Sequence, residues 1–114
     1  MCIWMAYVSI KALGENCYGG RDTAYLEALD WSIREMETFI IRNSDITADQ
    51  VTQGRAHFVR QILEGISADR ESVCAPGLGS GYPAPDKFPT RQEIEADMRG
   101  LLSIDRPPVW NPCL

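Results

Sequence analysis

The side chains of this chain that are capable of covalent or metal chemistry are four cysteines and one histidine. Cys2, Cys17, Cys74 and Cys113 lie far apart and form no C-x-x-C pair, which is the spacing used by zinc sites and thioredoxin-like motifs. Two alternatives remain, which are disulfide bonds and the reduced thiols of a cytosolic protein.

The predicted order of elements favours one disulfide pairing. Cys17 precedes, and Cys74 follows, a pair of helices predicted over residues 22–66. In an antiparallel hairpin both positions approach the same open end, so a Cys17–Cys74 bond would staple it. Cys2 and Cys113 lie near the two chain ends, which often meet in small domains, and a second bond between them is the companion hypothesis.

His57 is the only histidine, so any mechanism that needs an imidazole base must use it. It falls on the same side of its predicted helix as Gln50, Gln53, Gln61 and Glu64, away from the core side. We therefore expect an imidazole that faces solvent. The sequence predicts no catalytic residue, although a cleft enzyme that combines His57 with a cysteine or a carboxylate remains the alternative function.

Two pairs of acidic residues invite comparison with carboxylate metal sites in helical bundles. Glu35 and Glu37 lie in one predicted helix, and Glu93 and Asp97 lie in another. Such sites combine glutamates with E-x-x-H motifs, and this chain has none. We therefore interpret both pairs as solvated acidic faces and predict no metal site and no cofactor.

Two patterns that suggest phosphate or DNA binding also lack a necessary part. The glycine-rich stretch 77–81 is followed by neither a lysine nor an immediate helix, as a phosphate-binding loop requires. If Gly54 were the turn of a helix-turn-helix, Asp49 and Arg60 would occupy positions that must be apolar. The formal net charge of -5 also disfavours nucleic acid as a partner.

The element that must position these residues is the stretch 22–66. Its first helix starts near Asp22 or Thr23, either of which offers an N-cap side chain. The stripe that an amphipathic helix buries is formed by Leu26, Leu29, Ile33, Met36 and Ile40. Because further apolar residues widen this stripe, we expect the helix to be central.

The second helix of this stretch begins with a capping box. Thr47 and Gln50 have the required spacing, and the apolar face continues through Val51, Phe58 and Ile62. The short connection predicts an antiparallel hairpin whose two apolar faces meet. An interior glycine, Gly54, predicts a close crossing of the two helices.

The segments around this hairpin are less regular. Residues 2–13 form a short apolar run that fits a helix ended by Gly14 or a buried strand, and we favour the helix. Residues 67–89 are rich in proline and glycine and predict a long surface loop.

The last part of the chain combines a helix with an extended segment. A second capping box at Thr90 and Glu93 opens a helix with an apolar side. Residues 104–114 contain three prolines and predict an extended tail, in which Trp110 docks on the helices.

Together these features predict a single all-α domain spanning 1–114, a bundle of three to four helices around the central hairpin. The proportions of apolar and charged residues, 45% and 24%, are those of a folded globular protein. No apolar run approaches the length of a membrane-spanning helix. We expect a cytoplasmic protein, or an exported one whose signal peptide was removed if Cys17–Cys74 is a disulfide.

The leading functional hypothesis is a small acidic protein-binding module, such as an inhibitor, an immunity-type protein or an accessory subunit. We expect its protein partner to contact the long loop and the acidic helix faces. The sequence predicts neither the identity of this partner nor the oligomeric state.

Overall fold

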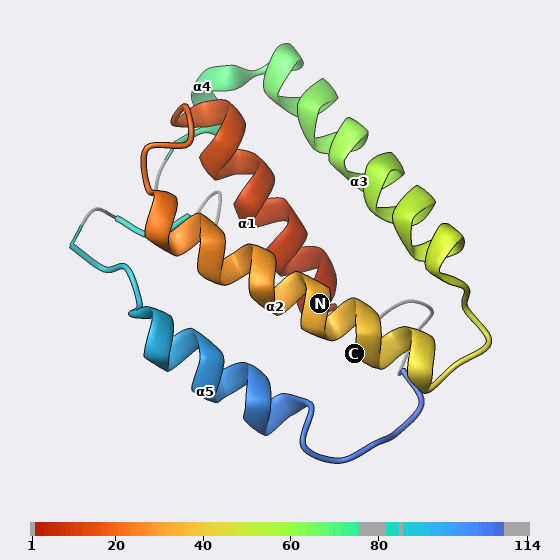
Figure 1. The fold of residues 1–114 in the computed structure, drawn as a ribbon. Helices are drawn as coiled ribbons and strands as arrows, with labels where there is room; N and C mark the ends of the chain where they lie inside the picture. Colours follow the sequence, from red (N-terminus) through yellow and green to blue (C-terminus); the bar gives the residue numbers. More distant parts are fainter. Residues whose placement is uncertain (1, 76–81, 85, 109–114) are drawn as a thin grey trace.

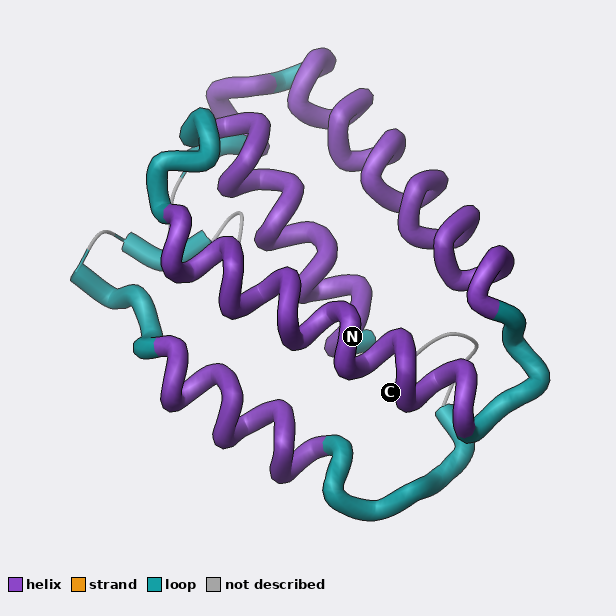
Figure 2. The backbone as a smooth tube through the Cα atoms, in the orientation of Figure 1, coloured by secondary structure: helices purple, strands orange, loops and turns teal. Residues whose placement is uncertain are grey.

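The structure is a computed structural model that describes residues 2–75, 82–84 and 86–108. This part of the chain contains five helices and no strand (Figures 1 and 2). The helices are α1 (Ile3–Cys17), α2 (Thr23–Arg42), α3 (Ala48–Ala68), α4 (Arg70–Val73) and α5 (Arg91–Leu101). The prediction of an all-α protein is confirmed.

The four longer helices lie side by side in the order α3, α1, α2, α5 (Figure 1). α2 and α3 are joined by residues 43–47 as predicted, but they diverge from this connection and α1 packs against both. The predicted contact between the apolar faces of α2 and α3 along their length is therefore not confirmed. The apolar run at the N-terminus supplies the helix that fills this space.

α2 is buried on several sides, as its wide apolar arc predicts. All five residues of the predicted stripe are buried, namely Leu26, Leu29, Ile33, Met36 and Ile40. Ile33, Met36 and Ile40 share one core cluster with Val8 of α1 and Met98 of α5. Helices on both sides of α2 thus bury the same element, which makes it the centre of the fold.

The starts of α3 and α5 are set by the two predicted capping boxes. The Thr47 side chain accepts a bond from the Gln50 amide, and the Gln50 side chain accepts one from the Thr47 amide, at 3.2 and 2.9 Å. Thr90 and Glu93 form the same pair of bonds at 3.1 and 3.0 Å. Each box satisfies two backbone donors that would otherwise lack a partner, and both predictions are confirmed.

Asp22 occupies the N-cap position of α2 but makes no side-chain capping bond. Its carboxylate instead accepts a hydrogen bond of 2.6 Å from the hydroxyl of Tyr82 and lies 3.3 Å from Nε of Arg21. The predicted start of the helix is correct, but the predicted role of this carboxylate is wrong, because a distant tyrosine competes for it.

α1 is a helix and not a strand, and it continues through Gly14 to Cys17. The predicted helix end at Gly14 is wrong. A methyl group on this residue would lie 2.5 Å from Cδ2 of Leu26 and 2.9 Å from the ring of Tyr82. At Gly54 a methyl group would meet nothing within 4 Å, so the predicted close crossing there is also wrong. The close approach in this fold involves α1.

The first residues of the stretch 67–89, which was predicted to be a loop, are helical. α3 extends to Ala68, and Asp69 caps the single turn of α4 by accepting a bond of 3.2 Å from the amide of Ser72. Residues 76–81 and 85, which include the whole glycine-rich stretch 77–81, lie outside the described residues. Tyr82 follows this stretch and is only 1% exposed, so it anchors the returning chain in the core.

After α5 the described chain continues to residue 108, and residues 105–108 form neither helix nor strand. An ion pair connects this segment to the end of α2, where Asp105 lies 2.8 Å from Nη2 of Arg42. The first part of the predicted tail is therefore free of regular secondary structure, and its predicted extended conformation is not confirmed. The predicted docking of Trp110 concerns a residue outside the described part of the chain.

Candidate functional site

A disulfide joins Cys17 and Cys74, which is one of the two alternatives that the sequence left open, with an S–S distance of 2.04 Å and a Cα–Cα distance of 5.5 Å. For these two residues the alternative of reduced thiols is therefore wrong. Cys2 is also disulfide-bonded, and its predicted partner Cys113 lies outside the described residues. Two hydrogen bonds reinforce the Cys17–Cys74 bridge, from the hydroxyl of Tyr18 to the carbonyl of Cys74 and from Arg70 to the carbonyl of Asn16.

Four aromatic residues pack beside this disulfide. We call Tyr18, Tyr25, Tyr82 and Phe88 the aromatic cluster. The ring of Tyr82 lies 4.6 Å from that of Tyr18 and 5.7 Å from that of Phe88, between ring centroids. Burial raises the pKa of Tyr25 to about 12, with a smaller contribution from Tyr7. The pKa of Tyr82 is also raised, first by burial and then by its bond to Asp22, so both hydroxyls stay neutral near physiological pH.

His57 lies on the exposed face of α3, as the sequence predicts. Its Nε2 atom is 3.3 Å from the amide nitrogen of Gln61. Among the described residues, its polar contact is this neighbour on the same helix, and neither a cysteine nor a carboxylate. The described residues around His57 therefore offer no geometry that favours the alternative enzyme hypothesis.

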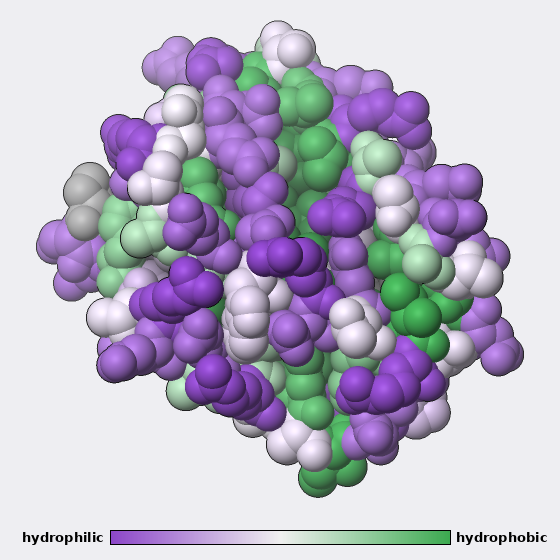
Figure 3. Space-filling view, viewed as in Figure 1, coloured by the Kyte–Doolittle hydropathy of each residue, from purple (hydrophilic) through white to green (hydrophobic). Residues whose placement is uncertain are grey.

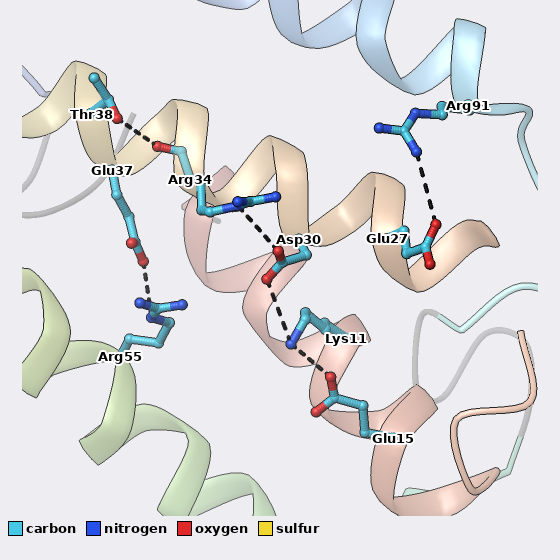
Figure 4. A network of polar contacts seen from close by, with 9 residues as sticks. All are labelled: Lys11, Glu15, Glu27, Asp30, Arg34, Glu37, Thr38, Arg55 and Arg91. Atoms are coloured by element: carbon cyan, nitrogen blue, oxygen red, sulfur yellow. Dashed lines mark hydrogen bonds and ion pairs between the residues drawn. The ribbon is translucent and has the colours of Figure 1, made fainter. Parts of the chain in front are cut away.

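The prediction that Glu35 and Glu37 both belong to a solvated face is wrong for Glu37. Its side chain accepts a hydrogen bond of 3.1 Å from the indole nitrogen of Trp4 and lies 3.1 Å from Nε of Arg55. It thereby connects α1, α2 and α3, with its ion pair drawn in Figure 4. Sequence spacing contained the signal, because residues two apart on a helix do not share a face and Glu37 lies four residues after buried Ile33.

The other carboxylates that were considered for a metal site serve different purposes. Glu93 is exposed and completes the capping box of α5, and Asp97 is exposed on the same helix. Within the described ranges, no group of three or more metal-ligating side chains is arranged to hold an ion.

Carboxylates on α2 are paired with cations of the same helix and of neighbouring helices (Figure 4). Asp30 lies 3.1 Å from Arg34 and 3.8 Å from Lys11 of α1, and Glu27 lies 4.0 Å from Arg91 of α5. These charges are solvated in part, and the carboxylates of Asp30 and Glu27 are paired within the molecule. The face is therefore mixed in charge, and Figure 3 shows hydrophilic and hydrophobic surface interspersed over it.

A pocket of about 260 Å³ opens between α2 and α5, and we call it the α2–α5 pocket. It is lined by Trp31, Glu35, Thr38, Phe39, Arg42, Met98, Arg99 and Leu102. The guanidinium of Arg99 lies 5.8 Å from the centroid of the half-buried Trp31 ring, within the range of a cation–π contact. Trp31 belongs to α2, and only the position of α5 shows that it borders a pocket.

A second pocket, of about 360 Å³, lies where the first turns of α2 and α5 meet, and we call it the N-terminal pocket. It is lined by Arg21, Asp22, Thr23, Ala24, Tyr25, Phe88, Pro89, Thr90 and Arg91. Two residues of the aromatic cluster thus form part of its wall. Sequence analysis missed it, because residues more than sixty positions apart build it.

Comparison of the chain with protein-family models, curated proteins and solved structures gives no match. Even the longest helix in the described part of the chain lacks the apolar stretch required to cross a membrane. We therefore infer function from the geometry of the chain itself.

Proposed function

We propose that this protein is a small protein-binding module, of the kind that includes inhibitors, immunity-type proteins and accessory subunits. The observation that carries this proposal is Trp31, which is half-buried in a pocket open to solvent with Arg99 against its ring. Tryptophan and arginine are the residue types most enriched at the energetic centres of protein interfaces. A partner side chain that enters this pocket would bury the exposed edge of the Trp31 ring and displace water from it.

The size and lining of the α2–α5 pocket support a protein side chain as the occupant. Its volume of about 260 Å³ is below the roughly 300 to 1,000 Å³ of typical small-molecule sites. Apolar side chains such as Phe39 and Met98 line its floor, and charged groups such as Glu35 and Arg42 stand at its edge. An apolar centre with a polar rim is the usual anatomy of a protein interface.

This proposal moves the contact surface away from the place that the sequence suggested. Two acidic groups of α2, Asp30 and Glu27, are engaged by Lys11, Arg34 and Arg91. Because these pairs cancel locally, long-range attraction by this face is weak and recognition depends on shape and on the groups in the pocket.

We also propose that the protein acts in an oxidising compartment, as an exported protein does. The Cys17–Cys74 bond supports this, because cytosolic reductants keep most thiols reduced. A thiol count on protein isolated from its native host without reductant tests the idea, and free Cys17 and Cys74 thiols in the folded protein would refute it.

The experiment that tests the binding function compares capture of host proteins by the wild type and three variants. Trp31→Ala and Arg99→Ala each remove one part of the pocket, whereas Arg60→Ala removes an exposed arginine on α3 as the matched control. We expect the wild type and Arg60→Ala to retain the same partner and both pocket variants to lose it by at least about tenfold in affinity. Circular dichroism confirms that all versions remain helical. A partner that binds all versions equally would overturn the proposal.

A further inference from the structure

The chain that follows α3 packs only lightly against the rest of the molecule. We call residues 69–75, which include α4, the α4 segment. No residue of α4 is buried, and within the segment only Val73 and Cys74 are partly buried. Because the segment removes little apolar surface from water, packing contributes little to its position. Its position therefore depends on specific bonds.

These bonds all reach the same turn at the end of α1. In the described part of the chain, they are the disulfide between Cys17 and Cys74 and two hydrogen bonds. The Tyr18 hydroxyl donates to the carbonyl of Cys74, and Arg70 donates to the carbonyl of Asn16 at 2.9 Å. Water can replace a hydrogen-bond partner at little net cost, but it cannot replace a covalent bond. The disulfide is therefore the attachment on which the segment depends.

The chain on each side of the α4 segment has anchors of its own. Ile66 of α3 is 5% exposed, and Tyr82 is 1% exposed with its hydroxyl bonded to Asp22 at 2.6 Å. Between these anchors, ordering the α4 segment costs conformational entropy in every residue. Two hydrogen bonds and the partly buried Val73 do not offset that cost without the covalent bond. The anchors limit the part of the chain that depends on the disulfide to this segment.

The α4 segment also covers apolar surface at the ends of α1 and α3. Val73 and Cys74 pack against the core cluster of Leu13, Ile66 and Tyr82. Leu13 and Ile66 are only 4% and 5% exposed while these neighbours are in place. Departure of the segment would bring part of this cluster into contact with water.

We propose that the Cys17–Cys74 bond is a redox latch, whose reduction releases the α4 segment from α1 and uncovers this apolar cluster while the four longer helices remain folded. The reductant is a dithiol. One of its thiolates attacks a sulfur of the disulfide and forms a mixed disulfide, and one cysteine leaves as a thiolate that takes up a proton. The second thiol of the reductant, as its thiolate, then displaces the other cysteine, so two electrons pass to the protein and the reductant becomes a disulfide.

The surroundings of the bond suit this exchange. Cys17 and Cys74 are both partly exposed, so a dithiol can reach the disulfide, whereas Cys2 is only 5% exposed. The latch is closed in the oxidising compartment proposed above and opens when the protein meets a dithiol. This inference goes beyond the proposed binding function and makes no use of the α2–α5 pocket.

The test is a measurement of nitrogen-15 relaxation on the full chain before and after addition of dithiothreitol. Alkylation and mass spectrometry establish that Cys17 and Cys74 have been reduced. We expect order parameters in the α4 segment to fall from about 0.85 to below about 0.6, and those of the four longer helices to stay near about 0.85. A segment that stays rigid after reduction would overturn the proposal, and so would loss of order in the longer helices.

Two double variants separate this bond from the disulfide of Cys2. In Cys17→Ser/Cys74→Ser the α4 segment should be released without reductant and should not respond further to dithiothreitol. Cys2→Ser/Cys113→Ser is the matched control, because it removes two other cysteines and keeps the latch, and its segment should respond as in the wild type. A response that disappears in the control variant would overturn the proposal.

The uncovered surface has its own measurement. The fluorescence of 1-anilinonaphthalene-8-sulfonate, a dye that binds exposed apolar surface, should rise on reduction while the far-ultraviolet circular dichroism of the longer helices is retained. An unchanged dye signal from protein with a released segment would contradict the covering role of that segment. None of these measurements uses Trp31, so their outcome is separate from that of the capture experiment.

Discussion

The two ends of this helical bundle are held together by different means. At the end near the α2–α3 connection, long helices bury aliphatic residues such as Ile40 and Val51 in one cluster. At the other end, the segments that follow α3 are one turn of helix or no helix, and they are fixed by the Cys17–Cys74 bond and the aromatic cluster. A long helix repeats an apolar stripe, whereas a short segment cannot and needs a few strong anchors.

Removal of the disulfide is expected to have the largest effect on stability. The bond closes a loop with a sequence separation of 57, for which the loss of chain entropy predicts about 4 kcal/mol. The double variant Cys17→Ala/Cys74→Ala should lower the free energy of unfolding in urea by about this amount. A loss below about 1 kcal/mol would show that the aromatic cluster holds this end without the covalent bond.

Truncation of Glu37 tests how much its polar contacts between the long helices stabilise the fold. Glu37→Ala leaves the buried indole N–H of Trp4 without its acceptor and removes the partner of Arg55. We expect a loss of about 2 kcal/mol, since Arg55 is partly exposed and its share is screened by solvent. Glu35→Ala, at the exposed position two residues earlier, should change stability by less than about 0.5 kcal/mol. Equal losses in chemical denaturation would contradict the buried role of Glu37.

Two glycine substitutions sharpen the comparison between α1 and α3. Gly14→Ala should destabilise the protein by about 1 to 3 kcal/mol, because the new methyl group collides with Leu26 and Tyr82. Gly54→Ala should stabilise it by up to about 1 kcal/mol, since the methyl group meets open space and alanine favours the helix. Thermal melting of both variants checks the opposite signs. A stabilising Gly14→Ala would contradict the close approach at α1.

The smallest effect concerns the response of the aromatic cluster to alkaline pH. The pKa of Tyr25 is raised to about 12 in the folded protein from an ordinary value of 10.0. A raised folded-state pKa means that this contribution to stability is complete below pH 10 and declines as the pH rises toward 12. Ultraviolet titration should show delayed ionisation in the folded protein, and this delay should shrink in Tyr25→Phe. In urea the tyrosines should titrate near their ordinary value, and an identical curve for the folded protein would contradict burial.

The limits of sequence reasoning are visible at particular residues. The capping boxes at Thr47 and Thr90 and the stripe of α2 were predictable, because the interacting groups lie three or four residues apart. The predicted close helix crossing at Gly54 was wrong, because a glycine allows close packing only where another helix lies against it, and none does here. Glu37 was misread because its partners, Trp4 and Arg55, come from two other helices.

The two candidate pockets depend even more on residues that are distant in the sequence. Trp31 and Arg99 are separated by most of the chain and become neighbours only when α5 packs on α2. Tyr25 and Phe88 likewise meet only after the chain returns from α4. Neither pocket has a local pattern, so neither was open to prediction from spacing.

The sequence by itself determined that this protein is all-helical, where its long helices begin and which face of α2 is buried. These properties follow from backbone hydrogen bonding and from apolar periodicity, both of which act over a few residues. Tertiary structure alone decided that α1 lies between α2 and α3. It also decided between a Cys17–Cys74 bond and reduced thiols, two alternatives that the sequence had left open. It also decided which side chains border the two pockets. The physical reason is that packing selects among many compatible pairings of helix faces, and local sequence does not record which pairing buries the most surface.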